Sequence, residues 1–216
     1  MRVLGAIIAG GKSSRMGQDK ALMVWRGKAL IERVIERLEP QVDELVINAN
    51  RPLPPMPSGE GRVGLVQRKH DLTPNTLNHP HPALPREERR RGPIRVIPDL
   101  LNIGTPLAGL HAVLTYALEN SFDAVLSAPC DAPLLPEDLR LRLQGDGAAI
   151  ACSGGQAHFL TGLWPAATLP LLIGLRRVQD FAAATKARRV EWAVQGHDPF
   201  TNLNTPEDLA RLSENP

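Results

Sequence analysis

The residues most suited to chemistry lie near the start of the chain, in the stretch AIIAGGKSSRMGQDKAL. A run of apolar residues ends at Ala9, and the glycine pair Gly10 and Gly11 follows directly. Backbone N–H groups at glycines can approach phosphate oxygens because no Cβ stands in the way. Arg15 offers a planar fork of donors and Lys20 a point charge, two complementary ways to neutralise a polyphosphate. The stretch therefore predicts a loop that binds a polyphosphate.

Two familiar phosphate-binding motifs do not describe this stretch. The pattern GxGxxG is absent. A Walker A loop would end in Gly11-Lys12-Ser13, but the position five before Gly11 is Ala6 and not glycine. For the glycines alone, a tight turn beside solvated cations is an equally good interpretation. The cations that follow them favour a phosphate loop of another type.

A polyphosphate enzyme also needs Mg²⁺, which carboxylates hold together with phosphate oxygens. Asp131 is the best candidate, because it follows a predicted strand at 124–127 and lies between Pro129 and Pro133. Ligands of open α/β sheets bind beyond the carboxyl ends of the parallel strands. We therefore expect Asp131 to face the glycine loop. Asp99 ends another predicted strand and is a second candidate for contact with base, ribose or metal.

The apolar pattern predicts the elements that must position these residues. Val3–Ala9 is a continuous apolar run, typical of a strand buried on both faces of a parallel sheet. Apolar residues recur at helical spacing from Leu30 to Leu38, and Glu44–Asn48 is the next short apolar run. Strand, loop, helix and strand form the βαβ opening of a doubly wound α/β fold.

Further elements are predicted along the rest of the chain. Strands are expected at 22–25, 94–98, 124–127, 148–152, 158–164 and 189–194, and helices at 107–118, 166–175 and 205–212, with a short helix opening at Pro136. Thr105 and Pro106 suit the start of the helix at 107–118, and Thr205 opens a capping box for the last helix. The fold class is thus α/β, with a mostly parallel central sheet and helices on both faces.

Residues 52–92 break this pattern. They contain eight prolines, no aromatic residue and no periodicity. Such a stretch cannot bury enough apolar surface to offset its chain entropy. We interpret it as an irregular insertion in a single domain that spans residues 1–216. A partner-binding arm that uses the basic run Arg86–Arg91 is the alternative.

Composition excludes several classes of function. The chain has 216 residues and a formal net charge of +2, but residues 52–92 alone carry +3, so the remainder is about −1 and a nucleic-acid partner is not expected. Two cysteines are too few for a disulfide framework, which favours a cytoplasmic protein. The opening VLGAIIA is too short to span a bilayer, so no membrane contact is expected.

Several spaced stretches resemble one known family. AGGKSSRMGQDKAL is similar to the signature loop of the molybdenum cofactor guanylyltransferases, the MobA family of nucleotidyltransferases. The stretches VINANR, VIPD, TPLAGL, APCDAPLLPEDL and FTNLNTPEDLARL also match, in the same order, and together cover nearly the whole chain except 52–92. The resemblance implies a three-layer, Rossmann-like nucleotidyltransferase fold. It also implies Mg²⁺-dependent transfer of GMP from GTP to molybdopterin, or to its molybdenum-loaded form, with release of pyrophosphate.

The resemblance also implies a role for each matching position. By family likeness, Ile8, Ala9 and Gly10 line the guanine and ribose end of the site, and Gly11, Arg15 and Lys20 hold the phosphates. Asn48 and Asp99 also contact the nucleotide, and Asp131 holds Mg²⁺. Asn202 and Asn204 face the pterin. The acceptor is an ionised phosphate monoester, so no strong general base is required. Positioning and charge stabilisation by Mg²⁺, Lys20 and Arg15 would supply the catalysis.

Three alternatives remain open. The cytidylyltransferase that uses CTP on the same pterin has a loop resembling AAG where this chain has AGG, and Gly10 leaves room for a purine. Other small-molecule nucleotidyltransferases share the loop but not the ending NLNTPEDL. A non-catalytic adaptor that holds nucleotide or cofactor is the alternative of a different class. Cofactor-transfer chaperones or molybdoenzymes are partners that the family likeness implies.

Other residue types receive a structural interpretation. His158 is expected to be a core or surface histidine, although AHFLTGLW resembles a family strand near the substrate cleft. The tryptophans stand in apolar contexts that favour core packing. Cys130 adjoins Asp131, but no histidine is placed to activate it as a nucleophile.

Overall fold

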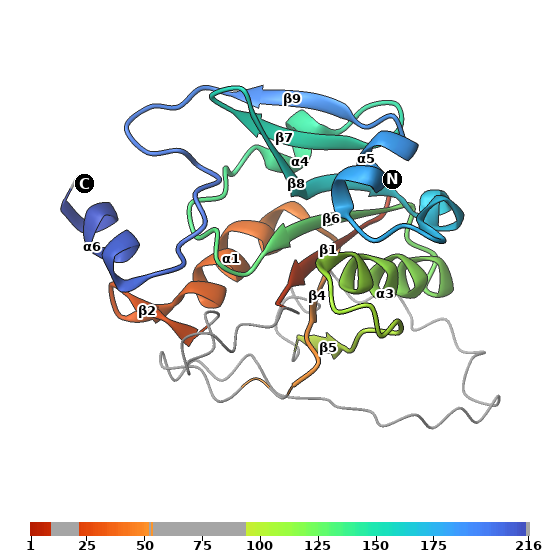
Figure 1. The fold of residues 1–216 in the computed structure, drawn as a ribbon, viewed down its shortest axis with the longest axis horizontal. Coiled ribbons are helices and arrows are strands. Elements are labelled where there is room, and N and C mark those ends of the chain that lie inside the picture. The colour runs from red at the N-terminus through yellow and green to blue at the C-terminus, as the bar shows by residue number, and fades with distance from the viewer. Residues whose placement is uncertain (10–21, 52, 54–93, 215–216) are drawn as a thin grey trace.

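The computed structural model describes residues 1–9, 22–51, 53 and 94–214, and a seven-stranded sheet lies at its centre (Figure 1). The strands in sheet order are β5 (Arg95–Ile97), β4 (Glu44–Asn48), β1 (Val3–Ile8), β6 (Ala124–Pro129), β8 (Gln156–Pro165), β7 (Ala149–Ser153) and β9 (Arg188–Trp192). Of these strands, β8 alone runs antiparallel to its neighbours. The predicted mostly parallel sheet is confirmed.

Helices cover both faces of the sheet, as predicted (Figure 1). One face carries α1 (Leu30–Leu38) and α4 (Leu139–Leu143), and the other carries α3 (Pro106–Glu119), the 3₁₀ helix η4 (Ala166–Leu172) and α5 (Val178–Ala184). A short 3₁₀ turn, η3 (Glu39–Gln41), follows α1. Near the C-terminus, α6 (Pro206–Glu214) packs beside the hairpin of β2 (Val24–Trp25) and β3 (Lys28–Ala29).

The first strand separates the two cores. All six residues of β1 are buried. Val3 and Ile7 pack in the core under α1, whereas Leu4 and Ile8 pack in the core under α3. This burial on both faces is what a continuous apolar run predicts for a central parallel strand.

The predicted helix starts are confirmed with one difference. At α6, Thr205 Oγ1 accepts a hydrogen bond from Asp208 N (3.1 Å), and Asp208 Oδ2 accepts one from Thr205 N (3.0 Å). This is the reciprocal pattern of a capping box. Thr105 and Pro106 begin α3 as expected, but the Thr105 side chain makes no capping hydrogen bond.

Three expectations differ from the structure. The helix expected at 166–175 is the shorter 3₁₀ helix η4, because Pro170 lies inside it and lacks the N–H that an α-helix needs. The helix α5 was not predicted, and α4 begins at Leu139 rather than at Pro136. Nearly all of the predicted insertion lies outside the described residues, although Leu53 is buried in the core under α1.

No helix among the described residues is long and apolar enough to cross a membrane.

A chain of two buried hydrogen bonds joins β6 to β8. Trp164 is fully buried, and its indole N–H donates to Ser127 Oγ (2.8 Å), which donates to Leu160 O (2.7 Å). We expect Ser127→Ala to lower the free energy of unfolding by about 1–3 kcal/mol, because the indole N–H loses its partner. Urea denaturation measures this loss.

The double variant Ser127→Ala/Trp164→Phe serves as the control. It removes the indole N–H together with its partner, so its loss should be smaller than the sum of the two single losses. Strict additivity would contradict this account of the pair.

Candidate active site

The predicted nucleotide residues stand at the ends of four adjacent parallel strands. In sheet order, Asp99 follows β5, Asn48 ends β4, Ile8 ends β1, and Asp131 follows β6. The register pairs Ile8 with Asn48 on one side and with Pro129 on the other. The chain turns from one half of the sheet to the other between β1 and β6, which is the switch point where open α/β sheets bind ligands.

Backbone hydrogen bonds hold the ends of β1, β4 and β6 together. Ala9 N donates to Asn48 O (2.9 Å), and Cys130 N donates to Ile8 O (3.3 Å). The chain therefore leaves β1 beside the residue that precedes Asp131. The predicted phosphate-binding residues that follow lie outside the described residues: Gly10, Gly11, Arg15 and Lys20.

Asp99 is held in one orientation by two asparagines. Asn48 Nδ2 donates to Asp99 Oδ1 (2.9 Å) and to Ile97 O (3.1 Å). Asn50 Nδ2 donates to Asp99 Oδ2 (2.7 Å), and Asp99 N donates to Asn50 Oδ1 (2.9 Å). The structure thus brings the predicted residues Asn48 and Asp99 into direct contact. Asn50 was not predicted as a site residue, although it lies in the stretch VINANR.

Gly109 allows α3 to approach the strand ends. Asn48 is fully buried, and a Cβ at position 109 would lie 2.1 Å from its Oδ1 and 3.1 Å from Ile8 Cγ2. These distances are too short for any side chain. Gly109 is a second site residue that was not predicted, and its signal was the glycine in TPLAGL.

The C-terminal segment lies against the predicted metal ligand. Leu203 N donates to Asp131 O (2.9 Å). The predicted pterin-side residues Asn202 and Asn204 flank Leu203, and Asn204 Nδ2 donates to Asn202 O (3.2 Å). Residues far apart in the sequence, Asp131 and 202–204, are therefore neighbours. The structure thus brings the predicted metal ligand and the predicted pterin-side residues together.

The donor set fits a metal that takes most of its ligands from a substrate. No group of three or more His, Cys, Asp or Glu side chains within the described part of the chain could hold a metal ion. Mg²⁺ commonly binds through one or two carboxylates and completes its octahedron with phosphates and water. Half-buried Asp131 at the strand end would suit such a role.

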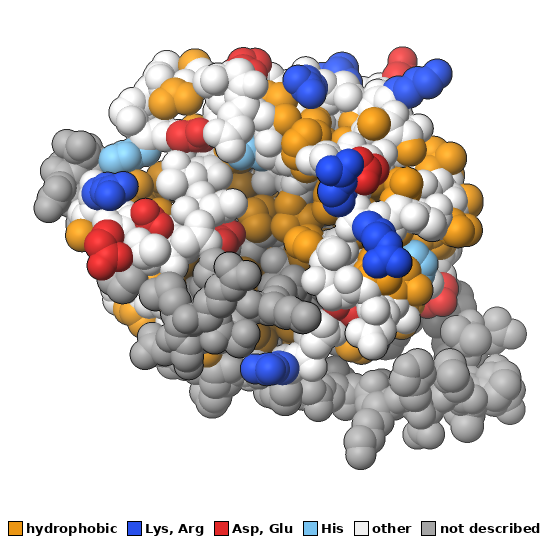
Figure 2. All heavy atoms as spheres, viewed as in Figure 1, with side chains coloured by type: hydrophobic (Ala, Val, Ile, Leu, Met, Phe, Trp, Pro, Cys, Tyr) orange, Lys and Arg blue, Asp and Glu red, His pale blue; other side chains and the backbone are white. Residues whose placement is uncertain are grey.

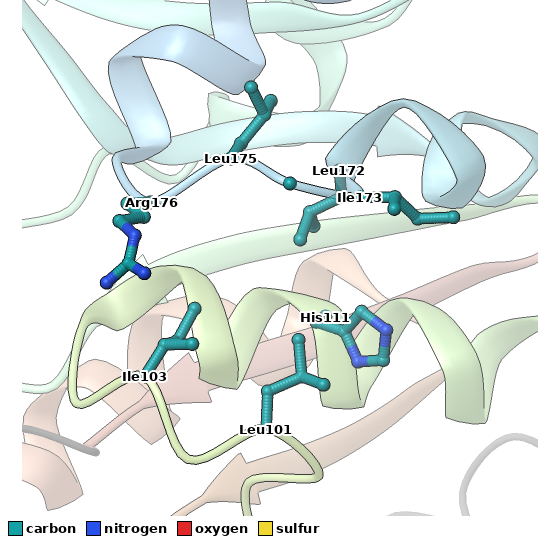
Figure 3. A pocket seen from close by; sticks show the side chains of 8 residues that line it. Leu101, Ile103, His111, Leu172, Ile173, Leu175 and Arg176 are labelled. Carbon is teal, nitrogen blue, oxygen red and sulfur yellow. The ribbon is translucent and has the colours of Figure 1, made fainter.

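A separate pocket of about 260 Å³ lies on the α3 face of the sheet (Figure 3). Its lining comes from the loop before α3, from α3, from the end of η4 and from the segment after η4: Leu101, Ile103, His111, Leu172, Ile173, Gly174, Leu175 and Arg176. Burial lowers the pKa of His111, whose Nδ1 has no hydrogen-bond partner among the described residues. None of the predicted site residues lines this largely apolar pocket.

Figure 2 shows one face of the molecule with its side chains coloured by type. Its described Lys and Arg side chains are interspersed with Asp and Glu and form no continuous basic stripe. Hydrophobic side chains are visible at the centre of this face, where the surface is hollowed.

Strand ends of a parallel sheet that meet at a switch point define an open α/β protein whose ligand binds at that edge. Residues 5–192 match the family model of the MobA-like NTP transferase domain. The molybdenum cofactor guanylyltransferase of Cereibacter sphaeroides is 39% identical over 98% of this chain and 95% of its own. The molybdenum cofactor guanylyltransferase of Rhodobacter capsulatus is 36% identical over 99% of this chain and 96% of its own length. The chain belongs to this family of MobA-like nucleotidyltransferases, as the spaced motifs indicated.

Solved structures support the same fold. A nucleotidyl transferase from Methanothermobacter thermautotroptrophicus superposes with a TM-score of 0.63 at 17% identity, covering 99% of this chain and 96% of its own. Molybdopterin-guanine dinucleotide biosynthesis protein A from Archaeoglobus fulgidus gives 0.62 at 20% identity, covering 98% and 97%. The expected nucleotidyltransferase fold is confirmed.

Gly109→Ala tests the close approach of α3 to the strand ends. The added methyl group would push Asn48 away from Asp99. Asn48 would then no longer hold the Asp99 carboxylate in place for the ligand. A hydrogen bond to a charged group contributes about 1.5–3 kcal/mol, and a tenfold loss of affinity corresponds to about 1.4 kcal/mol. We therefore expect calorimetry to show that GTP binds about tenfold more weakly or worse.

Glu119→Ala, at the exposed end of the same helix, is the matched control and should bind GTP normally. Wild-type affinity in Gly109→Ala would show that this contact does not shape the nucleotide site.

Proposed function

We propose that the protein transfers GMP from GTP to molybdopterin, or to its molybdenum-loaded form, and releases pyrophosphate. The product would be the guanine dinucleotide form of the molybdenum cofactor. The observation that carries the proposal is the meeting of Ile8, Asn48, Asp99 and Asp131 at one edge of the sheet. The relatives named molybdenum cofactor guanylyltransferase, similar over nearly the full chain, support this choice of reaction.

The order of the strands suggests where each substrate lies. Asp99, Asn48 and Ile8 belong to β5, β4 and β1, on one side of Asp131. Guanine and ribose would occupy that side, where the carboxylate of Asp99 is already oriented by its two asparagine partners. Residues 202–204 adjoin Asp131 through the Leu203 backbone and would face the pterin. The α-phosphate of GTP would then lie near Asp131, between base and acceptor.

The chemistry requires little from a general base. The acceptor phosphate is ionised at neutral pH, so the main barrier is the approach of one anion to another. Positioning and preorganised positive charge address that barrier. From their place in the sequence, Gly10 and Gly11 would contribute backbone N–H groups, and Arg15 and Lys20 would contribute charge.

Asp131 would hold Mg²⁺ in this proposal. When bound with GTP, the ion would neutralise phosphate charge and polarise the phosphoryl oxygens. The Asp131 backbone carbonyl is engaged by Leu203 N, which would fix the position of the residue while its carboxylate serves the metal.

The cellular setting is part of the proposal. Neither Cys130 nor Cys152 forms a disulfide bond, which supports a cytoplasmic location. Cofactor-transfer chaperones or molybdoenzymes would receive the product, a role that rests on family likeness alone.

One assay separates the proposal from its alternatives. The protein is incubated with Mg²⁺, molybdopterin and either GTP or CTP, and released pyrophosphate is measured. We expect GTP to be preferred by at least about tenfold in kcat/KM, since a pocket that fits a purine and pairs with its edge discriminates strongly. Preference for CTP would indicate the cytidylyltransferase. Binding of GTP without pyrophosphate release would indicate the adaptor.

Asp131→Asn tests the metal carboxylate. Loss of one charge-stabilising group at a reacting phosphate commonly lowers kcat by about 100-fold or more, and we expect a loss of that order. The thermal midpoint should stay close to that of the wild type, because the backbone bond to Leu203 is retained.

Asp146→Asn is the matched control, an exposed aspartate in the loop between α4 and β7 at the opposite edge of the sheet. Turnover of Asp131→Asn close to that of this control would remove Asp131 from the proposed role.

A further inference from the structure

A second group of polar side chains lies where β7 ends and β8 begins. Ser153 Oγ lies 2.6 Å from His158 Nε2 and 2.8 Å from each carboxylate oxygen of Asp198. Ser153 ends β7, His158 lies in β8, and Asp198 follows β9. Ser153 is buried, and the other two are half-buried. Three separate segments therefore converge on one hydroxyl group.

The donors and acceptors available to Ser153, His158 and Asp198 determine the direction of each hydrogen bond. An ionised carboxylate only accepts hydrogen bonds, so the single Ser153 proton goes to Asp198. His158 must then donate from Nε2 to Ser153 Oγ. Burial lowers the pKa of His158, against the opposing effect of Asp198 and Glu191. The neutral ring makes this bond when its proton is on Nε2.

The arrangement does not suit a hydrolase. In a serine hydrolase, histidine lies between serine and aspartate and removes the serine proton. Here the serine lies in the middle, is buried and donates to the carboxylate. Ser153 therefore cannot act as a nucleophile, and a positional role fits the geometry.

The group holds the segment that leads to the pterin-side asparagines. Asp198 Oδ1 accepts a further hydrogen bond from Phe200 N (2.9 Å). The buried Phe200 ring lies 4.8 Å from the His158 ring and 5.2 Å from the Trp192 ring, measured between centroids. Three residues later, Leu203 N reaches Asp131 O.

Residues 201–204 belong to no helix or strand, so a few anchors set their place. Segments with few backbone hydrogen bonds open easily unless side chains hold them. One set of anchors lies at its start: the Asp198 carboxylate, the Phe200 ring and the bond from Thr201 N to Asp198 O (3.1 Å). Further along, Leu203 is buried and bonded to Asp131, and Asn204 N donates to Asp208 Oδ2 (2.9 Å).

We propose that Ser153, His158 and Asp198 are positioning residues that hold Asn202 and Asn204 at the acceptor side of the site. They would set the affinity for the pterin phosphate acceptor and leave GTP binding unchanged, because the nucleotide residues lie on β5, β4 and β1. This inference rests on the proposed function, in which residues 202–204 face the acceptor.

The test measures both substrates separately in full-length variants. We expect Ser153→Ala and His158→Phe to raise KM for molybdopterin by about fivefold or more, with KM for GTP within about twofold of the wild type. His158→Phe keeps an aromatic ring against Phe200 but loses the Nε2 donor. His158→Gln can place an amide N–H near the position of Nε2 and should restore the acceptor KM to within about twofold. Equal rises in both KM values would overturn the proposal.

Hydrogen exchange supplies a readout that does not depend on activity. Without substrates, the amides of residues 200–204 should exchange about tenfold faster in Ser153→Ala than in the wild type, while amides of β1 keep their protection. Unchanged exchange at 200–204 would overturn the positional role, whatever the assay shows. Faster exchange in a protein that transfers no GMP to molybdopterin would instead count against the proposed function alone. If Ser153→Ala does not fold, the same exchange measurement is made on the near-isosteric variant Asp198→Asn and compared with the wild type.

Discussion

The parallel pairing of β1 with β6 is the constraint on which the rest of the site depends. Ile8 is in register with Pro129, and Cys130 N continues the ladder by donating to Ile8 O. Because β1 and β6 run in the same direction, the segments that follow them leave the sheet at the same edge. Ile8, two residues before the glycine pair, is therefore bonded to the residue that precedes Asp131, although more than a hundred residues separate them. An antiparallel partner at this position would have placed the two at opposite ends of the sheet.

Two sets of contacts fix the residues at this edge of the sheet, one on each side of Asp131. Asn48 satisfies its amide N–H groups on Ile97 O and Asp99, and the space beside its Oδ1 is filled by the backbone of α3 at Gly109. On the other side of Asp131, the C-terminal segment is fixed by Phe200 and Leu203. In the proposed function, β5, β4 and β1 would supply the nucleotide side, and an irregular segment would supply the acceptor side. That division would let one sheet edge hold two different anions in reacting positions.

Much of this could be predicted from the sequence, for identifiable reasons. Strands such as β1 and β4 are short apolar runs bounded by polar or glycine residues, and α1 has clear helical periodicity, so local pattern suffices. Asp99 and Asp131 were predicted as site residues because each follows a strand, and Asn48 because it matches a family position. The 3₁₀ helix at 166–172 was missed because its apolar residues suggest an α-helix and only Pro170 argues against one.

Other features depend on contacts that no local pattern reveals. Gly109 matters because of its distance to Asn48, and Asn50 because it reaches Asp99 across β4 and β5. His158 was expected to be an ordinary core or surface histidine. Its bond to Ser153 and the link to Asp198 join three segments that only the folded sheet brings together.

The most direct test of the central claim is the position of the metal–nucleotide complex relative to the strand ends. Paramagnetic broadening of backbone amide signals by Mn²⁺ bound with GTP would map it. The account predicts that broadening centres on the ends of β1 and β6, at Ile8, Ala9 and Cys130–Ala132, and spares residues 145–147 at the opposite edge. Broadening centred on the pocket beside α3, at Leu172–Arg176, would contradict it.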